Sequence, residues 1–305
     1  MSFTSIVKNE VSALEINEIE LITELSAIIR NIGVIEDKIK ITSENTNVIK
    51  RIFKIVKKLY QITPKVIVRR GYNFNKNYIY ILEIKTDLEK IKEDLNLEYI
   101  IPKDYIYADT ELKRAYLRGL FLATGSINDP KTSRYHLEFS VDINEYAEFI
   151  KELLNEFRLN SKIIKRENKY IIYIKEAEKI SDFLRIINAI NAVFYYEDIR
   201  IYRDHKNMTN RLNNCEQANV EKIIETANKQ LKDIEIIEQN DVFELLDDKL
   251  KEAATYRKKY PEASLVELSE IITLETGKNI TKSGLYHRLN KIKELATKID
   301  KNKTS

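Results

Sequence analysis

The hydrophobic and polar positions of this chain describe one succession of elements that occurs twice. In each copy, two stretches have apolar residues at helical spacing, and three shorter stretches are rich in β-branched and aromatic residues. We expect the order helix, strand, helix, strand, strand at 18–32, 36–42, 46–60, 65–70 and 78–85, and again at 110–124, 135–141, 144–158, 161–166 and 169–175. Each copy exposes an apolar helix face that only the other copy can cover, so the duplication predicts two α/β repeats packed together.

Shorter segments flank and join the two copies. Apolar residues at helical spacing predict a short amphipathic helix at 3–15, which we expect to pack on the body, and a further helix at 176–188. Turns are expected at Gly71-Tyr72-Asn73 in the first copy and at Glu167-Asn168 in the second. Proline disfavours helix at the residue before it, so Ile100-Ile101-Pro102-Lys103 is the expected connector between the copies.

A long charged stretch follows the second copy. Residues 190–240 are predicted to be helical, with the best run at Cys215–Leu231. No glycine or proline occurs between Pro130 and Pro261, so we expect a helical bridge rather than a flexible linker. Cys215 is interpreted as a small buried residue of this helix.

A proline stop and a capping box predict the first two helices of the C-terminal region. One helix is expected at Asp247–Tyr260, where the following proline stops it. Ser264 and Glu267 have the spacing of a capping box, so a second helix should begin at Leu265. The side chains expected to point inward from it are Leu268, Ile271 and Ile272.

A third helix completes a helix-turn-helix pattern. Gly277 marks the turn, and Thr281 can cap a helix on which Leu285, Leu289 and Ile292 share one face. Two short capped helices separated by a turn, the second ending in lysines, are typical of a helix-turn-helix.

Small residues recur every four positions in the first helix of each copy. They are Thr23, Ala27 and Asn31 in the first copy, and Ala115, Gly119 and Ala123 in the second. Such residues lie on one helical stripe, where a second helix backbone can approach closely. We therefore expect these two helices to pack on each other, with Ala27 and Gly119 at the crossing.

The charge of the chain is unevenly distributed. Its net charge of +3 is too small to indicate nucleic-acid binding, but residues 281–305 hold seven basic and two acidic residues. A net +5 at this end, on a body that sums to −2, is typical of a surface that faces phosphates, and a solvated basic tail is the alternative.

Composition excludes several kinds of site. A single cysteine rules out an internal disulfide, and with three histidines beside it the chain has no zinc-ligand spacing. No phosphate-cradling glycine loop, nucleophile elbow or zinc-protease motif occurs, so we expect neither a cofactor nor an enzyme. No segment approaches the roughly 18 apolar residues of a membrane span, and no signal peptide is evident, so we expect a cytoplasmic protein without membrane contact.

The sequence also resembles a known family. The nonamers Leu25–Gly33 and Leu117–Gly125 look like degenerate copies of the LAGLIDADG motif of homing endonucleases. Segments that resemble the WhiA family of bacterial DNA-binding regulators are Arg114–Pro130, Asn210–Asn219, Pro261–Leu265 and Thr281–Leu289. The resemblance implies an α+β fold, in which a pseudo-two-fold LAGLIDADG-like saddle of two α/β repeats precedes an all-α helix-turn-helix domain.

By this resemblance the chain has three parts. An N-terminal LAGLIDADG-like repeat is expected at 1–103, a second at 104–208, and a helical linker with a helix-turn-helix domain at 209–305, its motif at about 264–297. WhiA proteins are transcriptional regulators tied to sporulation in some lineages and to cell division or chromosome segregation in others. The resemblance implies a nucleoid-associated protein that binds double-stranded DNA, with any regulatory protein partner unknown. A non-enzymatic nucleoid or division scaffold and an active endonuclease are the alternatives.

The two nonamers bear directly on the endonuclease alternative. In the nucleases, the acidic residue before the last glycine of each motif holds the divalent metal that activates water. Ile32 and Thr124 occupy those positions here and offer no carboxylate, so we expect no metal and no cleavage. Asp37, Asp109 and Asp129 match no motif position, and we interpret them as strand, cap and turn residues.

The expected DNA contacts lie mainly on the third C-terminal helix, opposite its apolar face. The residues are Lys282, Ser283, Tyr286, His287, Arg288, Asn290 and Lys291. We expect Ser283 and His287 to contact bases, with Asn290 a further candidate. The basic residues Lys282, Arg288 and Lys291 are expected mainly to engage the DNA backbone. A partly buried, structural role is the alternative for His287, and an ordinary solvated face is the alternative for the lysines. Basic strand residues of the saddle are further candidates, with ordinary solvated positions as the equal alternative: Lys65, Arg69, Arg70, Lys162, Lys165 and Arg166.

Overall fold

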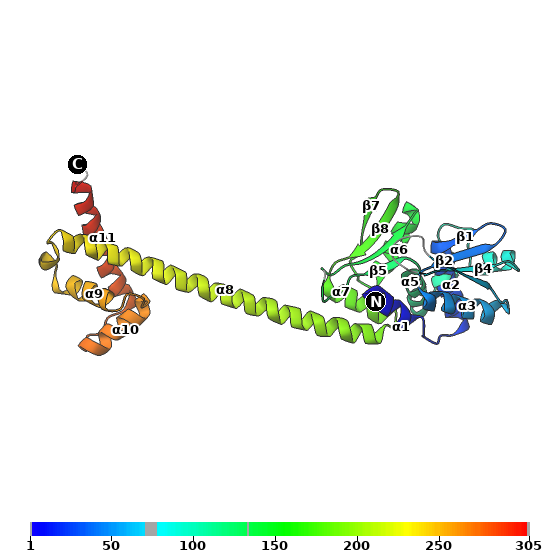
Figure 1. Ribbon diagram of the computed structural model, residues 1–305, viewed down its shortest axis with the longest axis horizontal. Coiled ribbons are helices and arrows are strands. Elements are labelled where there is room, and N and C mark those ends of the chain that lie inside the picture. Colours follow the sequence, from blue (N-terminus) through cyan, green and yellow to red (C-terminus); the bar gives the residue numbers. More distant parts are fainter. Residues whose placement is uncertain (1, 71–77, 133, 304–305) are drawn as a thin grey trace. The chain divides into compact units, whose positions relative to one another are not determined.

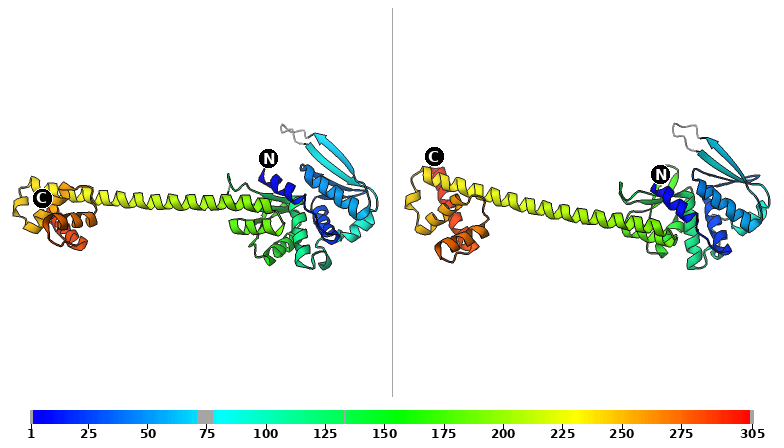
Figure 2. Two further views of the ribbon diagram at one scale, coloured as in Figure 1. Left: turned by 90° about the horizontal axis from the view of Figure 1, so that it is seen from below. Right: turned by 60° about the horizontal axis from the view of Figure 1, so that its bottom comes forward.

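The computed structural model describes residues 2–70, 78–132 and 134–303, and it divides into two compact units, residues 1–204 and 205–305 (Figures 1 and 2). The turn predicted at Gly71-Tyr72-Asn73 lies outside the described residues. Among the described residues, no helix is both long and apolar enough to cross a membrane.

The first unit consists of two repeats with the same succession of elements. The first repeat contains α2 (Glu18–Ile32), β1 (Gly33–Ile35), β2 (Ile39–Ser43), α3 (Thr46–Tyr60), β3 (Lys65–Arg70), β4 (Tyr78–Ile84) and α4 (Leu88–Asp94). The second contains α5 (Thr110–Thr124), β5 (Gly125–Ile127), β6 (Leu137–Val141), α6 (Asn144–Glu156), β7 (Lys162–Arg166), β8 (Lys169–Ile174) and α7 (Ala177–Ile186). The sheets are antiparallel, in the orders β1-β2-β4-β3 and β5-β6-β8-β7. The predicted α+β class with duplicated repeats is confirmed.

The predicted pattern lacked one short strand in each repeat. This strand directly follows α2 in the first repeat and α5 in the second, the helices that carry the two nonamers. The single strand expected at 36–42 is a hairpin of β1 and β2, and β5 occupies the same place in the second repeat. Asp37 therefore lies in the hairpin turn and not in a strand. Gly33 and Gly125 have extended backbones directly after their helices, with φ of −83° and −66°. β1 and β5 have three residues each and follow their helices directly. Three residues are too few for an alternation of apolar and polar positions to reveal a strand in the sequence.

Helices α2 and α5 pack closely along their small residues. A Cβ atom on Gly119 would lie 2.3 Å from the carbonyl oxygen of Glu24 and 2.9 Å from the Cβ of Ala27. The flanking residues Leu25, Ile28 and Leu120 are fully buried. The absence of a side chain at position 119 therefore allows the two backbones to meet.

Helix α1 (Phe3–Val11) ties the two repeats together. Phe3, Val7 and Val11 are buried, but the helix ends four residues earlier than predicted because the chain turns at Ser12. Thr4 Oγ1 donates to the carbonyl of Ile127 and accepts from its N–H, each at 2.9 Å. A 3₁₀ turn, η1 (Asp104–Tyr107), lies in the connection between the repeats.

Helix α8 (Ile190–Gln239) confirms the predicted helical character of residues 190–240. Ala192 and Tyr196 are buried in the first unit, and Ile234 and Ile237 are buried in the second. Cys215 is exposed, so its interpretation as a buried residue was wrong. The residues on either side of Cys215 in α8 are exposed as well.

The second unit completes its core with η2 (Phe243–Leu245), α9 (Asp248–Lys259), α10 (Leu265–Thr276) and α11 (Lys282–Lys303). The capping box of Ser264 and Glu267 is present as predicted. Gly277 ends α10 in the left-handed region at φ +70°, and Thr281 Oγ1 accepts from the N–H of Gly284. The buried side chains include Leu268, Ile272, Leu285, Leu289 and Ile292, whereas Ile271 is only half-buried.

Candidate nucleic-acid interface

The solvent face of α11 is set by the helical period. Leu285, Leu289 and Ile292 are at most 3% exposed, and they hold α11 against the rest of the second unit. At about 100° per residue the opposite face must point outward. Of the seven residues predicted to contact DNA, five are exposed: Lys282, Ser283, Tyr286, His287 and Lys291. Asn290 is half-buried on the same side.

Tyr286 and His287 form a ring pair on this face. Their ring centroids lie 5.8 Å apart at an interplanar angle of 67°, an edge-to-face arrangement. His287 is exposed, so it is not the buried structural histidine of the alternative interpretation. The pair offers a hydroxyl, two ring nitrogens and apolar ring surface beside Ser283.

Arg288 is separated from the other predicted residues by its ion pair with Glu252. Its Nη1 donates to Glu252 Oε2 of α9 at 3.0 Å, and the two side chains are 22% and 13% exposed. Lys278 also reaches Glu252, at 3.3 Å. The Arg288 guanidinium therefore holds α11 to α9. Position 288 lies at the edge of the buried face of α11, and from there the side chain reaches Glu252.

A second arginine, missed by the sequence reading, fixes the chain before α10. Arg257 is 1% exposed, and its Nη1 donates to the carbonyl of Ala263 at 2.6 Å. Burial lowers its pKa from the ordinary value. Three basic residues occur in the last turn of α9, so nothing local in the sequence distinguishes Arg257 as the buried one.

Strand register divides the basic residues of the saddle between two faces. Side chains alternate along a strand, and Val66 pairs with the fully buried Leu82 on the face covered by α3. Of the six basic candidates, the ones on the open faces, away from the helices, are Lys65, Arg69, Lys162 and Arg166. Arg70 and Lys165 lie on the opposite faces, and Lys165 Nζ lies 5.7 Å from the ring centroid of Tyr170.

The open face of the first sheet is basic around one carboxylate. Glu83 accepts from Lys38 Nζ at 2.8 Å, and this hydrogen bond, with the nearby charges of Lys85 and Lys65, lowers the pKa of Glu83. Lys40 pairs with Glu83 across the strands. Lys38, Lys40, Lys65 and Lys85 lie around Glu83, and Asp37 and Glu36 lie near Lys38, so this face keeps a small net positive charge that can attract phosphates.

The described residues at the ends of α2 and α5, the helices that carry the two nonamers, include no cluster of acidic groups that could hold a metal ion. Ile32 and Thr124 are the last residues of α2 and α5, and Thr124 Oγ1 lies 3.4 Å from the carbonyl oxygen of Leu120. Asp109 caps α5 by accepting from Leu112, and Asp129 accepts from Lys131 in a turn, as interpreted from the sequence. Within the described ranges, no group of three or more His, Cys, Asp or Glu residues could hold a metal ion.

A buried ionic cluster, also missed by the sequence reading, lies between the motif helices. Glu24 Oε2 accepts from Arg118 Nε at 2.7 Å and from Arg51 Nη2 at 3.0 Å. Arg118 Nη2 also donates to Glu20 at 2.9 Å. The local signal in the sequence was Arg118, the one charged residue of the second nonamer, whereas Glu24 lies just before the first nonamer.

These features define a protein with two LAGLIDADG-like repeats followed by a helix-turn-helix domain. Profiles of the WhiA N-terminal LAGLIDADG-like domain, the WhiA LAGLIDADG-like domain and the WhiA C-terminal HTH domain match residues 18–98, 113–206 and 209–296. The chain belongs to the WhiA family.

Relatives and a solved structure cover nearly the whole chain. The "Probable cell division protein WhiA" of Staphylococcus carnosus is 41% identical over 310 residues, which are 98% of each chain. The protein of the same name from Bacillus cytotoxicus is 42% identical over 98% of this chain and 97% of its own. The crystal structure of full-length DUF199/WhiA from "Thermatoga maritima" has a TM-score of 0.59 and 26% identity, and covers 98% of this chain and 99% of its own.

Proposed function

We propose that this protein is a transcriptional regulator that recognises double-stranded DNA through the solvent face of α11 and acts in cell division. The observation that carries the proposal is the division of α11 into a buried apolar face and an exposed face with basic, hydroxyl and aromatic side chains. The names of the relatives support a role in cell division, rather than the sporulation role of other lineages.

The exposed residues of α11 suit two kinds of contact. Ser283 and His287 lie in its first two turns, the part of a recognition helix that meets base edges. Asn290 lies one turn further, and Tyr286 is at the flank. Lys282 and Lys291 are placed to engage phosphates, which set affinity but carry no sequence information. Arg288 serves mainly to position α11, since a phosphate contact would compete with its bond to Glu252.

The saddle adds affinity without sequence specificity or cleavage. Lys65 and Arg69 of the first sheet, and Lys162 and Arg166 of the second, have the register to face a phosphate backbone. Ile32 and Thr124 supply no carboxylate for a divalent metal, which supports a binding role over an endonuclease.

A genome-wide binding map combined with footprinting tests the proposal. A regulator should protect defined promoter sites, and the protection should be lost in a Ser283→Ala, His287→Ala double variant. A nucleoid or division scaffold would instead bind broadly, without defined sites. Broad binding that the double variant leaves unchanged would exclude recognition by α11.

A further inference from the structure

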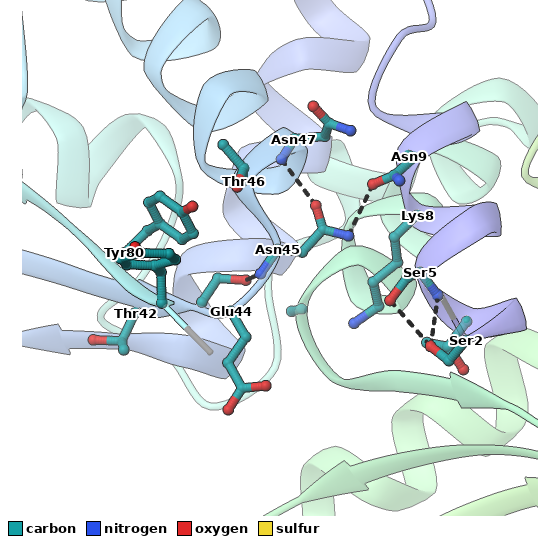
Figure 3. A pocket seen from close by; sticks show the side chains of 14 residues that line it. Ser2, Ser5, Lys8, Asn9, Thr42, Glu44, Asn45, Thr46, Asn47 and Tyr80 are labelled. Atoms are coloured by element: carbon teal, nitrogen blue, oxygen red, sulfur yellow. Dashed lines mark hydrogen bonds between the residues drawn. The ribbon is translucent and has the colours of Figure 1, made fainter. Parts of the chain in front are cut away.

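A cavity of about 820 Å³ lies in the first unit, between α1 and the connection from β2 to α3 (Figure 3). Ser5 and Lys8 of α1 line one side, and Thr42 and Asn45 line the other. Ala123, near the end of α5, adds a wall from the second repeat. Small-molecule sites have volumes of roughly 300–1,000 Å³, so this cavity has room for a ligand much larger than a single inorganic anion.

The walls are held by hydrogen bonds before any ligand enters. Asn45 Nδ2 donates to Asn9 Oδ1 at 3.0 Å, which joins the β2–α3 connection to α1. Thr4 holds α1 to the second repeat through both backbone groups of Ile127. A ligand would therefore bind with little ordering of the chain, which favours affinity.

Lys8 gives the cavity a positive charge that has no ionic partner among the described residues. Its ammonium lies 5.8 Å from the ring centroid of Phe121, and burial lowers its pKa to about 8. No carboxylate forms an ion pair with Lys8 among the residues described. Glu44 is the carboxylate in the wall, and Figure 3 shows its side chain turned away from Lys8. Lys8 is half-buried, and a charge that is partly withdrawn from water is costly until an opposite charge joins it.

The other groups around Lys8 suit an oxyanion. The hydroxyls of Ser5 and Thr42 can donate to phosphate oxygens. The 15-residue helix α3 begins at Thr46 in the cavity wall. Asn45 Oδ1 already accepts from the N–H groups of Asn47 and Val48, so the helix contributes the positive end of its dipole rather than these two donors. Tyr80, on a further wall, offers a ring on which a flat ligand could stack.

We propose that this cavity binds a phosphate group of a nucleotide-sized ligand, with the Lys8 ammonium as the counter-charge. The site is independent of DNA recognition by α11, so either function can fail without the other. Backbone phosphates of DNA have the same chemistry as a free nucleotide, and the experiment has to separate these two sources.

Calorimetric titration of the full-length protein tests the free ligand. The probes are inorganic phosphate, AMP, ADP and ATP, with adenosine as the phosphate-free control. Lys8→Met replaces the half-buried cation with an apolar side chain of similar length, and Lys90→Met removes an exposed charge of the same unit. A nucleotide should bind the wild type and Lys90→Met equally, at least tenfold more weakly to Lys8→Met, and adenosine should not bind.

A salt series with random-sequence duplex tests the DNA source. If backbone phosphates enter the cavity, Lys8→Met should flatten the salt dependence of binding by about one unit relative to Lys90→Met, and no nucleotide should bind. Labelling of Lys8 with acetic anhydride gives an independent measure, because a bound phosphate should protect the amine from reaction. The proposal is overturned if no nucleotide binds, the salt slopes are equal and no probe changes the labelling of Lys8.

Discussion

Arg118 and Glu24 join the two repeats through a charge-assisted hydrogen bond of 2.7 Å, with both side chains at most 1% exposed. Removing one partner of a buried pair leaves the other charge without compensation. Arg118→Met should therefore lower the stability of the first unit by about 3–5 kcal/mol, measured by calorimetry on the full chain. Lys113→Met, which removes the partly exposed pair with Glu156, is the control and should cost at most about 1 kcal/mol. Equal effects of the two variants would contradict a structural role for the buried cluster.

Gly119 makes a second prediction about the contact between α2 and α5. Any Cβ at this position would meet the Glu24 carbonyl at 2.3 Å, well inside van der Waals contact. Gly119→Leu should force the helices apart and lower the free energy of unfolding by about 1–3 kcal/mol or more. Gly284→Ala is the matched control, because its new Cβ would meet only Thr281 Oγ1, at 3.3 Å. An unchanged melting temperature for Gly119→Leu would show that the helices separate without loss.

Supercoiled DNA provides the test of catalysis. With Mg²⁺ or Mn²⁺, purified protein should leave a plasmid intact, because Ile32 and Thr124 give a metal no carboxylate. Agarose gels over a time course measure the conversion to nicked circles. Nicking by the wild type that disappears in Thr124→Ala would mean that the motif helices still assemble a catalytic centre.

Lys8 predicts how stability depends on pH. Its pKa is about 8 in the folded chain, against an ordinary value of 10.5. Between these two values the unfolded chain binds more protons, so the contribution of Lys8 to the free energy of unfolding becomes more favourable as pH rises. Lys8→Met should raise the melting temperature at pH 7, and the difference from wild type should shrink as the pH approaches 10. A difference that stays constant over this range would show that Lys8 remains protonated.

The parts of the fold that could be predicted are those set by local pattern. The bounds of α2, α3 and α5 follow the apolar period of the sequence, and the capping box before α10 is readable from two residues. The ionic partners could not be predicted in this way. Arg118 lies 94 residues from Glu24, and Arg288 lies 36 from Glu252, so only the folded chain brings them together.

The cavity beside Lys8 was beyond the sequence for the same reason. It is built from α1, the β2–α3 connection and the end of α5, which are brought together only by the packing of both repeats. A lysine on a short amphipathic helix also looks like an ordinary solvated residue. The six basic strand residues, by contrast, could be divided between two faces as soon as the register was known.

The two kinds of contact proposed for α11 predict different binding signatures. Lys291→Ala should weaken binding to specific and random duplexes alike and flatten the salt slope by about one unit, because a phosphate contact carries no sequence information. His287→Ala or Ser283→Ala should instead reduce discrimination at particular base pairs by about 1–3 kcal/mol. Fluorescence anisotropy with matched specific and random duplexes, over a salt series, measures both effects.

Arg288→Ala separates a positioning role from direct contact with DNA. The loss of its bond to Glu252 should lower the melting temperature of the second unit, and binding should weaken because α11 is less well held. Arg288→Ala, Glu252→Ala should then bind no more weakly than the single variant, since the bond between these two residues is already lost and Glu252 keeps only its longer pair with the exposed Lys278. If binding fell while the melting temperature stayed at the wild-type value, Arg288 would have to be assigned to the DNA backbone. If the His287 and Ser283 variants kept the wild-type ratio of specific to random binding, the recognition surface would have to lie outside α11.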